Sequence, residues 1–159
     1  VSEGNIEAIR KDVSIGIPSD WDISSDKQLL ACLDGIGIRS HQLALWGTGK
    51  ARREFLHAKD CALAVLHFLQ YVDANQQDRC YNIGTGNDLE IQEIAEMIAS
   101  IVGFTGSLVF DATKPDGTPR KVLNVERAHK AGWKHSIALN DGLKSVIEEY
   151  RIKGPEHAR

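Results

Sequence analysis

The apolar runs that could form β-strands in this chain are only four residues long. They are "LALW" (43–46), "CYNI" (80–83) and "SLVF" (107–110), and glycines or polar turn residues follow each of them. Longer segments with helical patterns separate these runs. The order predicts a mixed α/β chain of short strands and helices, without room for a complete doubly wound sheet.

The helical segments have recognisable boundaries. Residues 91–102 are apolar at i, i+3, i+4, i+7, i+10 and i+11, which predicts an amphipathic helix ended by Gly103. Residues 58–71 are apolar on most faces and predict a core helix, with Asp60 capping or complementing its N-terminus. Shorter helices are expected after a cap at Ser25 or Asp26, within residues 124–133 and over about 140–151.

Both ends of the chain carry loop signals. Residues 1–25 contain turns such as "GIPSD" (16–20) and predict an irregular arm, whereas "KGPEHAR" (153–159) predicts a frayed tail. "DATKPDGTPRK" (111–121) holds two prolines and a glycine and predicts a loop. The chain opens at Val1 without an obvious beginning, so we expect a piece of a longer protein.

Composition excludes several classes of function. The 159 residues carry 19 basic and 22 acidic side chains, a net charge of −3, so there is no basic excess for nucleic acid or an anionic membrane. No apolar run approaches the roughly 20 residues that span a bilayer. Cys32, Cys61 and Cys80 form no CxxC pair and are expected to be buried free thiols in a reducing cytoplasm.

The catalytic and cofactor motifs that glycines suggest are incomplete. "GTGK" (47–50) is not a phosphate-binding loop, because Ala44 and Ala51 stand where that pattern needs glycine and Ser or Thr. "IGTGND" lacks the third glycine of the dinucleotide fingerprint, and no tyrosine has a lysine four residues later. Metal-ligand spacings and G-x-S-x-G are missing as well. We therefore predict no catalytic, cofactor-binding or metal-binding residue in this chain.

Two clusters remain as candidate anion sites. In "LWGTGKARREFLH", Arg52 and Arg53 follow a glycine turn and could bind a phosphate, and Trp46 could stack on a purine or ribose. In "KPDGTPRK", Asp116 suits sugar or ribose hydroxyls and Lys121 suits a phosphate charge. Either cluster alone also fits a solvated basic loop. Together they indicate a site for a nucleotide-sugar diphosphate.

Whole phrases of the chain resemble the GDP-L-fucose synthase family of extended short-chain dehydrogenases/reductases. The phrases are "LWGTGKARREFLHAKD", "YNIGTGNDLEIQEIAEMIASIVGF", "LVFDATKPDGTPRKVLNVERAHKAGW" and "IALNDGLKSVIEEY". They cover roughly residues 43–151 in the family's order. The resemblance implies a substrate-binding domain at 41–152, an arm or insertion with a short helix at 1–40, and a flexible tail at 153–159. An N-terminal Rossmann portion that binds NADP would be absent from this chain.

The resemblance also implies an activity for the full enzyme. It converts GDP-4-keto-6-deoxy-D-mannose to GDP-L-fucose by 3,5-epimerisation and NADPH-dependent reduction at C4, as a cytoplasmic homodimer. By motif position, Trp46, Arg53, Asp116 and Lys121 match residues that contact the substrate nucleotide. This chain would supply the GDP-sugar half and be inactive alone. Its isolated form is expected to be poorly stable or self-associating, because apolar faces would be left uncovered.

The chain departs from the family pattern at two positions. Lys59 stands beside Asp60 where the family has two acids, and Glu90 stands where the family often has a capping threonine. Neither position touches the expected substrate contacts. His57 is expected to pack or cap a helix, and Cys80 to lie in the core.

Two alternatives stay open at this stage. One is a related epimerase or reductase that acts on another nucleotide sugar, and the other is a stand-alone nucleotide-sugar binding module without a reaction.

Overall fold

The structure is a computed structural model and describes residues 6–13, 21–73 and 80–153. Helices in these ranges are α1 (Ile6–Val13), α2 (Asp26–Gly35), α3 (Ala58–Tyr71), α4 (Ile91–Val102), α5 (Glu126–Lys130) and α6 (Leu139–Lys153). Strands are β1 (Ile38–Arg39), β2 (Gln42–Trp46), β3 (Arg52–Arg53), β4 (Leu89–Glu90), β5 (Ser107–Asp111) and β6 (Arg120–Lys121). The mixed α/β class with short strands is confirmed. The predicted "GIPSD" turn and all of the tail beyond Lys153 lie outside the described residues.

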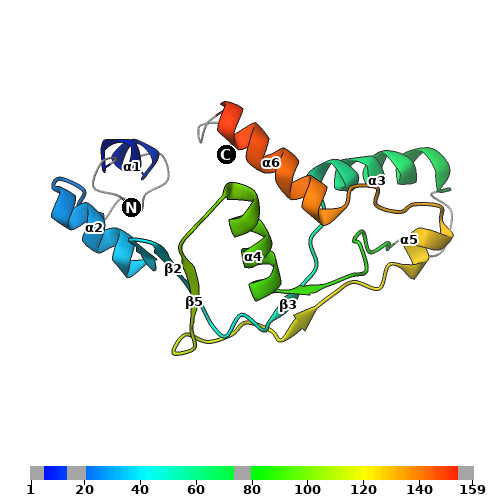
Figure 1. Cartoon of the computed structure of the whole chain (residues 1–159). Helices are drawn as coiled ribbons and strands as arrows, with labels where there is room; N and C mark the ends of the chain where they lie inside the picture. Colours follow the sequence, from blue (N-terminus) through cyan, green and yellow to red (C-terminus); the bar gives the residue numbers. More distant parts are fainter. Residues whose placement is uncertain (1–5, 14–20, 74–79, 154–159) are drawn as a thin grey trace.

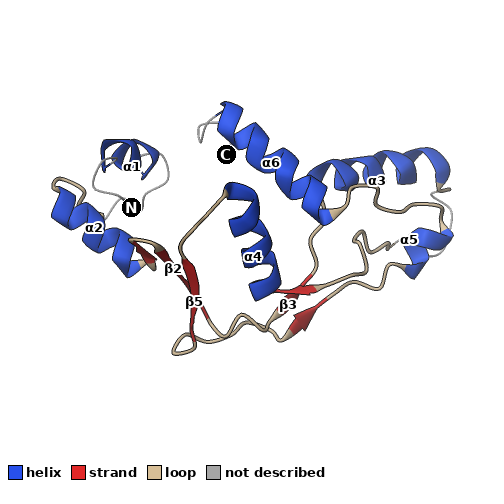
Figure 2. Ribbon diagram, in the orientation of Figure 1, coloured by secondary structure: helices blue, strands red, loops and turns tan. Residues whose placement is uncertain are grey.

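The described strands form two small sheets, shown in red in Figure 2. The first has the order β1-β2-β5, in which β2 runs parallel to β5 and Trp46 is the register partner of Asp111. The second has the order β4-β3-β6 and consists of strands of two residues. Figure 1 shows α1 and α2 near the first sheet, α3 and α5 at the opposite end of the molecule, and α4 between them.

The helices with strong local signals form where the sequence predicts them. Ser25 caps α2 and its hydroxyl accepts a hydrogen bond from the Gln28 amide at 3.3 Å. Gly103 ends α4 in the left-handed conformation at φ 73°. At the start of α4, the Gln92 amide donates to the carbonyl of Gly49 at 2.9 Å. Two amides at the N-terminus of α4, those of Ile91 and Gln92, are therefore satisfied by backbone carbonyls of Ala51 and Gly49.

Residues 80–83 were expected to form a strand, and this prediction is wrong. No described strand lies beside them, and their polar groups bond to side chains and loops instead. The Cys80 carbonyl accepts from Arg127 at 2.9 Å, and the Asn82 amide donates to the Asn124 carbonyl at 3.1 Å. A short apolar run becomes a strand only when another strand supplies its ladder.

Two expected irregular segments contain regular structure. Residues 6–13 form α1, which is joined to α2 by an ion pair of 2.6 Å between Arg10 and Asp26. The predicted loop 111–121 ends in β6, which pairs with β3. In both segments, contacts with residues distant in the sequence stabilise a helix or strand that the local sequence pattern does not predict.

α3 forms as predicted, but its expected role as a core helix is wrong. Ala64 and Asp60 are the buried residues of α3, whereas Leu66 and Leu69 are 60% and 78% exposed. The small core on the buried side of α3 consists of Ala64, Ala128 and Trp133, with Leu56, Phe68 and Ile83 packed against it. The described part of the chain supplies packing for one side of α3 only.

The cysteines are free as expected but are not buried. Cys61 and Cys80 are exposed, and Cys32 is partly exposed. Cys80 therefore does not lie in the core, because the segment around it runs over the surface rather than within a sheet. The helices of the described ranges all fall short of the length and apolar character that crossing a membrane would take.

Candidate functional site

The second sheet sorts four basic side chains onto two faces. Arg52 pairs with Arg120 and Arg53 pairs with Lys121 across β3 and β6. The Arg52 amide extends this ladder by donating to the Pro119 carbonyl at 2.8 Å. Because successive side chains of a strand point to opposite faces, Arg52 and Arg120 share one face while Arg53 and Lys121 share the other.

The face of Arg52 and Arg120 is neutralised by acids. Asp88 lies between the two guanidinium groups, with its Oδ1 at 2.9 Å from Nε of Arg52 and its Oδ2 bonded to Nε of Arg120. Glu90 adds a longer contact of 3.4 Å to Arg52. The hydrogen bonds from Arg120 and Arg52 hold the pKa of Asp88 below its usual range.

The opposite face presents the two cations Arg53 and Lys121. In the described part of the chain, neither Arg53 nor Lys121 forms an ion pair. Nη1 of Arg53 donates to the carbonyls of Arg52 and Thr118 at 2.7 and 2.6 Å, which fixes its guanidinium group. Lys121 is exposed. A fixed guanidinium beside an exposed ammonium group is a suitable arrangement for a phosphate.

Asp116 is held against the glycine turn that follows β2. Its Oδ1 accepts from the Thr48 amide at 2.8 Å and its Oδ2 from the Thr48 hydroxyl at 2.6 Å. These bonds, the hydroxyl first, lower the pKa of Asp116 and keep it ionised. The turn requires Gly47, which has φ 83° and would press a Cβ onto the Asp116 carboxylate.

Trp46 ends β2 and is 68% exposed, and the Lys114 ammonium lies 5.6 Å from the centre of its ring. The loop that carries Asp116 also reaches Arg53, because a Cβ at Gly117 would lie 2.9 Å from Nη2 of Arg53. The structure thus links Asp116 to the turn that follows Trp46, the loop of Asp116 to Arg53, and Arg53 to Lys121.

Sequence reasoning missed Glu54, which ties the second glycine turn to this sheet. Its Oε1 accepts from the amides of Thr85 and Gly86, and its Oε2 accepts from the Leu123 amide at 2.8 Å. A Cβ at Gly84 would lie 2.4 Å from the Glu54 carboxylate. Glu54 and Thr85 are 31 positions apart, and no sequence spacing predicts such a contact. The one sequence feature that could have indicated it is the Gly-Thr-Gly turn, whose backbone amides need an acceptor.

In both Gly-Thr-Gly turns a carboxylate of the chain lies where the pyrophosphate of a dinucleotide would bind. Glu54 occupies the amides of the turn at 84–86, and Asp116 occupies the Thr48 amide in the turn at 47–49. An anionic cofactor would have to displace a carboxylate from either turn. Neither turn fits NADP, and within the described ranges no three His, Cys, Asp or Glu side chains are grouped to hold a metal ion.

His57 and Asp60 prove to be structural. Nδ1 of His57 accepts from the Lys59 amide at 3.1 Å and caps α3, which confirms the expected role. Asp60, which was expected to serve the N-terminus of α3, instead accepts from the Ser136 hydroxyl at 2.8 Å and from the Ile137 amide at 2.9 Å. It lies in the first turn of α3, but its carboxylate connects α3 to the segment before α6.

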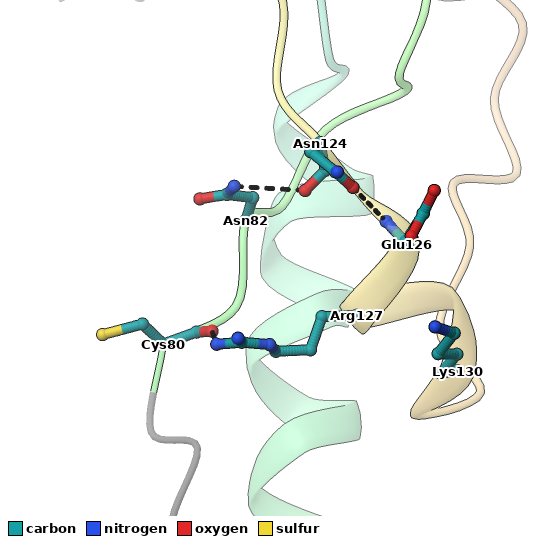
Figure 3. Close-up of a pocket in the computed structure, with 6 residues that line it drawn as sticks. All are labelled: Cys80, Asn82, Asn124, Glu126, Arg127 and Lys130. Atoms are coloured by element: carbon teal, nitrogen blue, oxygen red, sulfur yellow. Dashed lines mark hydrogen bonds between the residues drawn. The ribbon is translucent and has the colours of Figure 1, made fainter.

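A separate polar hollow of about 570 Å³ lies beside α5 (Figure 3). Its lining residues are Cys80, Asn82, Asn124, Glu126, Arg127 and Lys130. In Figure 3 the Cys80 thiol points away from Arg127, which contacts the Cys80 carbonyl. None of the four predicted site residues lines this hollow.

Comparisons with known proteins agree with this fold. Residues 27–84 match the model of the NAD dependent epimerase/dehydratase family. A GDP-L-fucose synthase of Escherichia coli (strain K12) is 45% identical over 112 residues, which cover 67% of this chain and 35% of that protein. A solved GDP-6-OMe-4-keto-L-xylo-heptose reductase from C. jejuni is 35% identical with a TM-score of 0.81, covering 96% of this chain and 44% of that one.

A second solved structure supports the same assignment. It is a GDP-D-glycero-L-gluco-heptose synthase from Campylobacter jejuni in the presence of NADPH, 35% identical with a TM-score of 0.78, covering 94% of this chain and 42% of that one. The fold is therefore that of a Rossmann-like epimerase or reductase. The chain is a homologue of the GDP-L-fucose synthases, and it spans 32–35% of the length of such relatives.

Proposed function

We propose that this chain supplies the GDP-sugar-binding part of an NADP-dependent epimerase and reductase. The observation that carries the proposal is the pairing of Arg53 with Lys121, neither of which forms an ion pair with another residue that the structure describes. Two cations that are register partners on neighbouring strands match the charge of a diphosphate. The homology to GDP-L-fucose synthases supports a GDP-sugar as the compound that carries this diphosphate.

The remaining predicted residues complete the proposed site. The exposed ring of Trp46 offers a stacking surface for guanine or ribose. Asp116, kept ionised by Thr48, still has lone pairs to accept hydrogen bonds from ribose hydroxyls. These residues bind and orient the nucleotide, and none of them is assigned a proton transfer.

For the whole enzyme we propose conversion of GDP-4-keto-6-deoxy-D-mannose to GDP-L-fucose, by epimerisation at C3 and C5 and reduction at C4. NADPH supplies the hydride when bound, and we assign its binding to residues outside those described here. Residues 41–152 would form the substrate-binding domain, with 1–40 as an arm and 153–159 as a tail. Exposed free thiols at Cys61 and Cys80 support a reducing compartment such as the cytoplasm. A homodimer is proposed for the whole enzyme.

Calorimetric titration of the chain with GDP, UDP and dTDP tests this proposal. We expect GDP to bind best, and Arg53→Gln and Lys121→Gln each to weaken GDP binding about tenfold. Lys144→Gln removes an exposed cation from α6 and should leave the affinity unchanged. Absence of GDP binding, or equal loss in the Lys144 variant, would overturn the proposed site.

A second candidate is a reductase or epimerase acting on another GDP-sugar. It is supported by the two solved heptose enzymes, each of which is 35% identical to this chain and covers at least 94% of it. Both candidates share the GDP site, so GDP binding does not distinguish them. Activity assays of the whole enzyme with the GDP-linked 4-keto-6-deoxymannose and heptose substrates do. The intact mass of the natural polypeptide distinguishes a stand-alone binding module from both enzymes. For such a module the mass would lie near 17.5 kDa.

A further inference from the structure

Asp88 is a buried carboxylate that bridges two arginines of the second sheet, although it is not one of the proposed binding residues. Its side chain is 5% exposed, although both arginines that it contacts are considerably more exposed, at 38% and 64%. Arg52 also donates from Nη2 to the Asp88 carbonyl at 3.0 Å. The residue therefore holds Arg52 through its side chain and its backbone, and Arg120 through the other carboxylate oxygen.

The pairing of β3 with β6 depends on this carboxylate. Arg52 and Arg120 are direct register partners, and like charges at directly opposite positions destabilise a pair of strands. Each strand is only two residues long, so few ladder hydrogen bonds oppose that repulsion. Asp88 converts a repulsive pair into a bridged one, in which each guanidinium contacts its own carboxylate oxygen.

The same bridge determines which cations are available to an anion. The register that Asp88 stabilises also places Arg53 opposite Lys121 on the other face. Without Asp88, Arg120 would lose its carboxylate partner and Arg52 would keep only the longer contact with Glu90, so repulsion between the two guanidinium groups would favour separation of β3 and β6. The carboxylate thus concentrates the accessible positive charge of the sheet on one face.

We propose that Asp88 is a positioning residue for anion binding, which acts through Arg52 and Arg120 to hold Arg53 and Lys121 side by side. The identity of the anion as a GDP-sugar diphosphate rests on the proposed function. The positioning of the two strands does not rest on it, because it follows from the charges and the register alone.

Two measurements on the same variants test this inference. Hydrogen exchange of the Arg52 amide, which bonds to the Pro119 carbonyl, reports the β3–β6 pairing without a ligand. Calorimetric titration with GDP reports the anion site. Asp88→Asn removes the charge at nearly constant shape, and Asp34→Asn is its control, because Asp34 forms an exposed ion pair with Arg39.

We expect Asp88→Asn to speed exchange of the Arg52 amide and to weaken GDP binding by about tenfold, with the Asp34 variant unchanged. Adding Arg52→Gln to Asp88→Asn removes the repulsion and should restore most of the affinity. Such a rescue by charge removal is not expected of a merely structural carboxylate.

Several results would overturn the inference. They are unchanged exchange in Asp88→Asn, unchanged GDP affinity despite faster exchange, and loss of affinity that Arg52→Gln does not rescue. If Asp88→Asn does not fold but the double variant does, the charge argument stands, whereas failure of both variants to fold contradicts it. If the unmodified chain does not bind GDP, the proposed function fails, and the exchange measurement still decides the positioning of the strands.

Discussion

Asp60 of α3 and Ser136, 76 residues further along the chain, are joined by three hydrogen bonds. The Ser136 amide donates to both carboxylate oxygens at 3.1 and 3.2 Å, and its hydroxyl donates to Oδ1 at 2.8 Å. Asp60 is only 2% exposed, so these donors replace water around its charge. The contact connects the N-terminal turn of α3 to the segment that leads into α6.

Replacing Asp60 should therefore destabilise the chain. Asp60→Ala leaves the buried amide donors of Ser136 and Ile137 without acceptors, and we expect a loss of about 2 kcal/mol in the free energy of unfolding. Urea denaturation followed by circular dichroism measures this loss. Asp34→Ala, in an exposed ion pair, is the control and should change stability little. Equal effects of the two variants would contradict the structural role of Asp60.

The same carboxylate should make stability depend on acid pH. Burial alone raises the pKa of Asp60, but hydrogen bonds from Ile137 and Ser136 outweigh it and lower the pKa below the ordinary value of 3.8. The unfolded chain then binds a proton more readily, so stability falls as the pH drops from about 5 through the folded pKa. Unfolding curves at successive pH values should show a steeper fall for the unmodified chain than for Asp60→Asn. Parallel pH profiles would count against this assignment.

Gly84 should not tolerate a side chain. An added Cβ would lie 2.4 Å from the Glu54 carboxylate, which holds the amides of the turn at 84–86. Gly84→Ala is expected to lower the free energy of unfolding by about 1–3 kcal/mol, because Glu54 must move. Gly35→Ala in α2 is a matched control, since nothing lies within 4 Å of its added Cβ and alanine favours a helix by about 0.5–1 kcal/mol. Thermal melts of the two variants should shift in opposite directions.

The sequence predicts elements best where the signal is local. The apolar period of 91–102 and Gly103 define α4, and the cap at Ser25 defines the start of α2. The strand predicted at 80–83 fails because a strand needs a partner, and no local pattern shows whether one is present. β6 is missed for the converse reason, since its partner β3 is far away in sequence.

In the candidate site too, the sequence predicts local features but not contacts between distant segments. Residue types and turn glycines are enough to single out Arg53 and Lys121, but not to show that they are register partners. Asp88 is not identifiable from the sequence because its role is to bridge Arg52 and Arg120, which are register partners but lie 68 residues apart in the sequence. Charge patterns therefore predict candidates, whereas strand pairing determines which charges remain unneutralised.

The exposed side of α3 should cause self-association of the isolated chain. Leu66 and Leu69 are 60% and 78% exposed, and neighbouring Val65 is 55% exposed. A contiguous apolar surface of this kind promotes association. Sedimentation velocity over a range of concentrations should show oligomers that disappear in the Leu66→Gln and Leu69→Gln double variant. Ile152→Gln, at a residue 75% exposed on α6, should not have this effect. A concentration-independent monomer for the unmodified chain would contradict the prediction.

Thr48 should influence the nucleotide site through Asp116. Its hydroxyl and amide both donate to the Asp116 carboxylate and fix it against the turn after β2. Thr48→Val removes the hydroxyl donor at similar volume, so Asp116 loses one of its two restraints and its pKa should rise towards the ordinary value. We expect GDP affinity to fall by about threefold to tenfold, from one lost hydrogen bond. Thr113→Val is the matched control, because the Thr113 hydroxyl and amide hold Asp111 in the same way and Asp111 is not one of the four proposed binding residues. Equal GDP affinities for the Thr48 variant and the unmodified chain would show that Asp116 needs no such restraint.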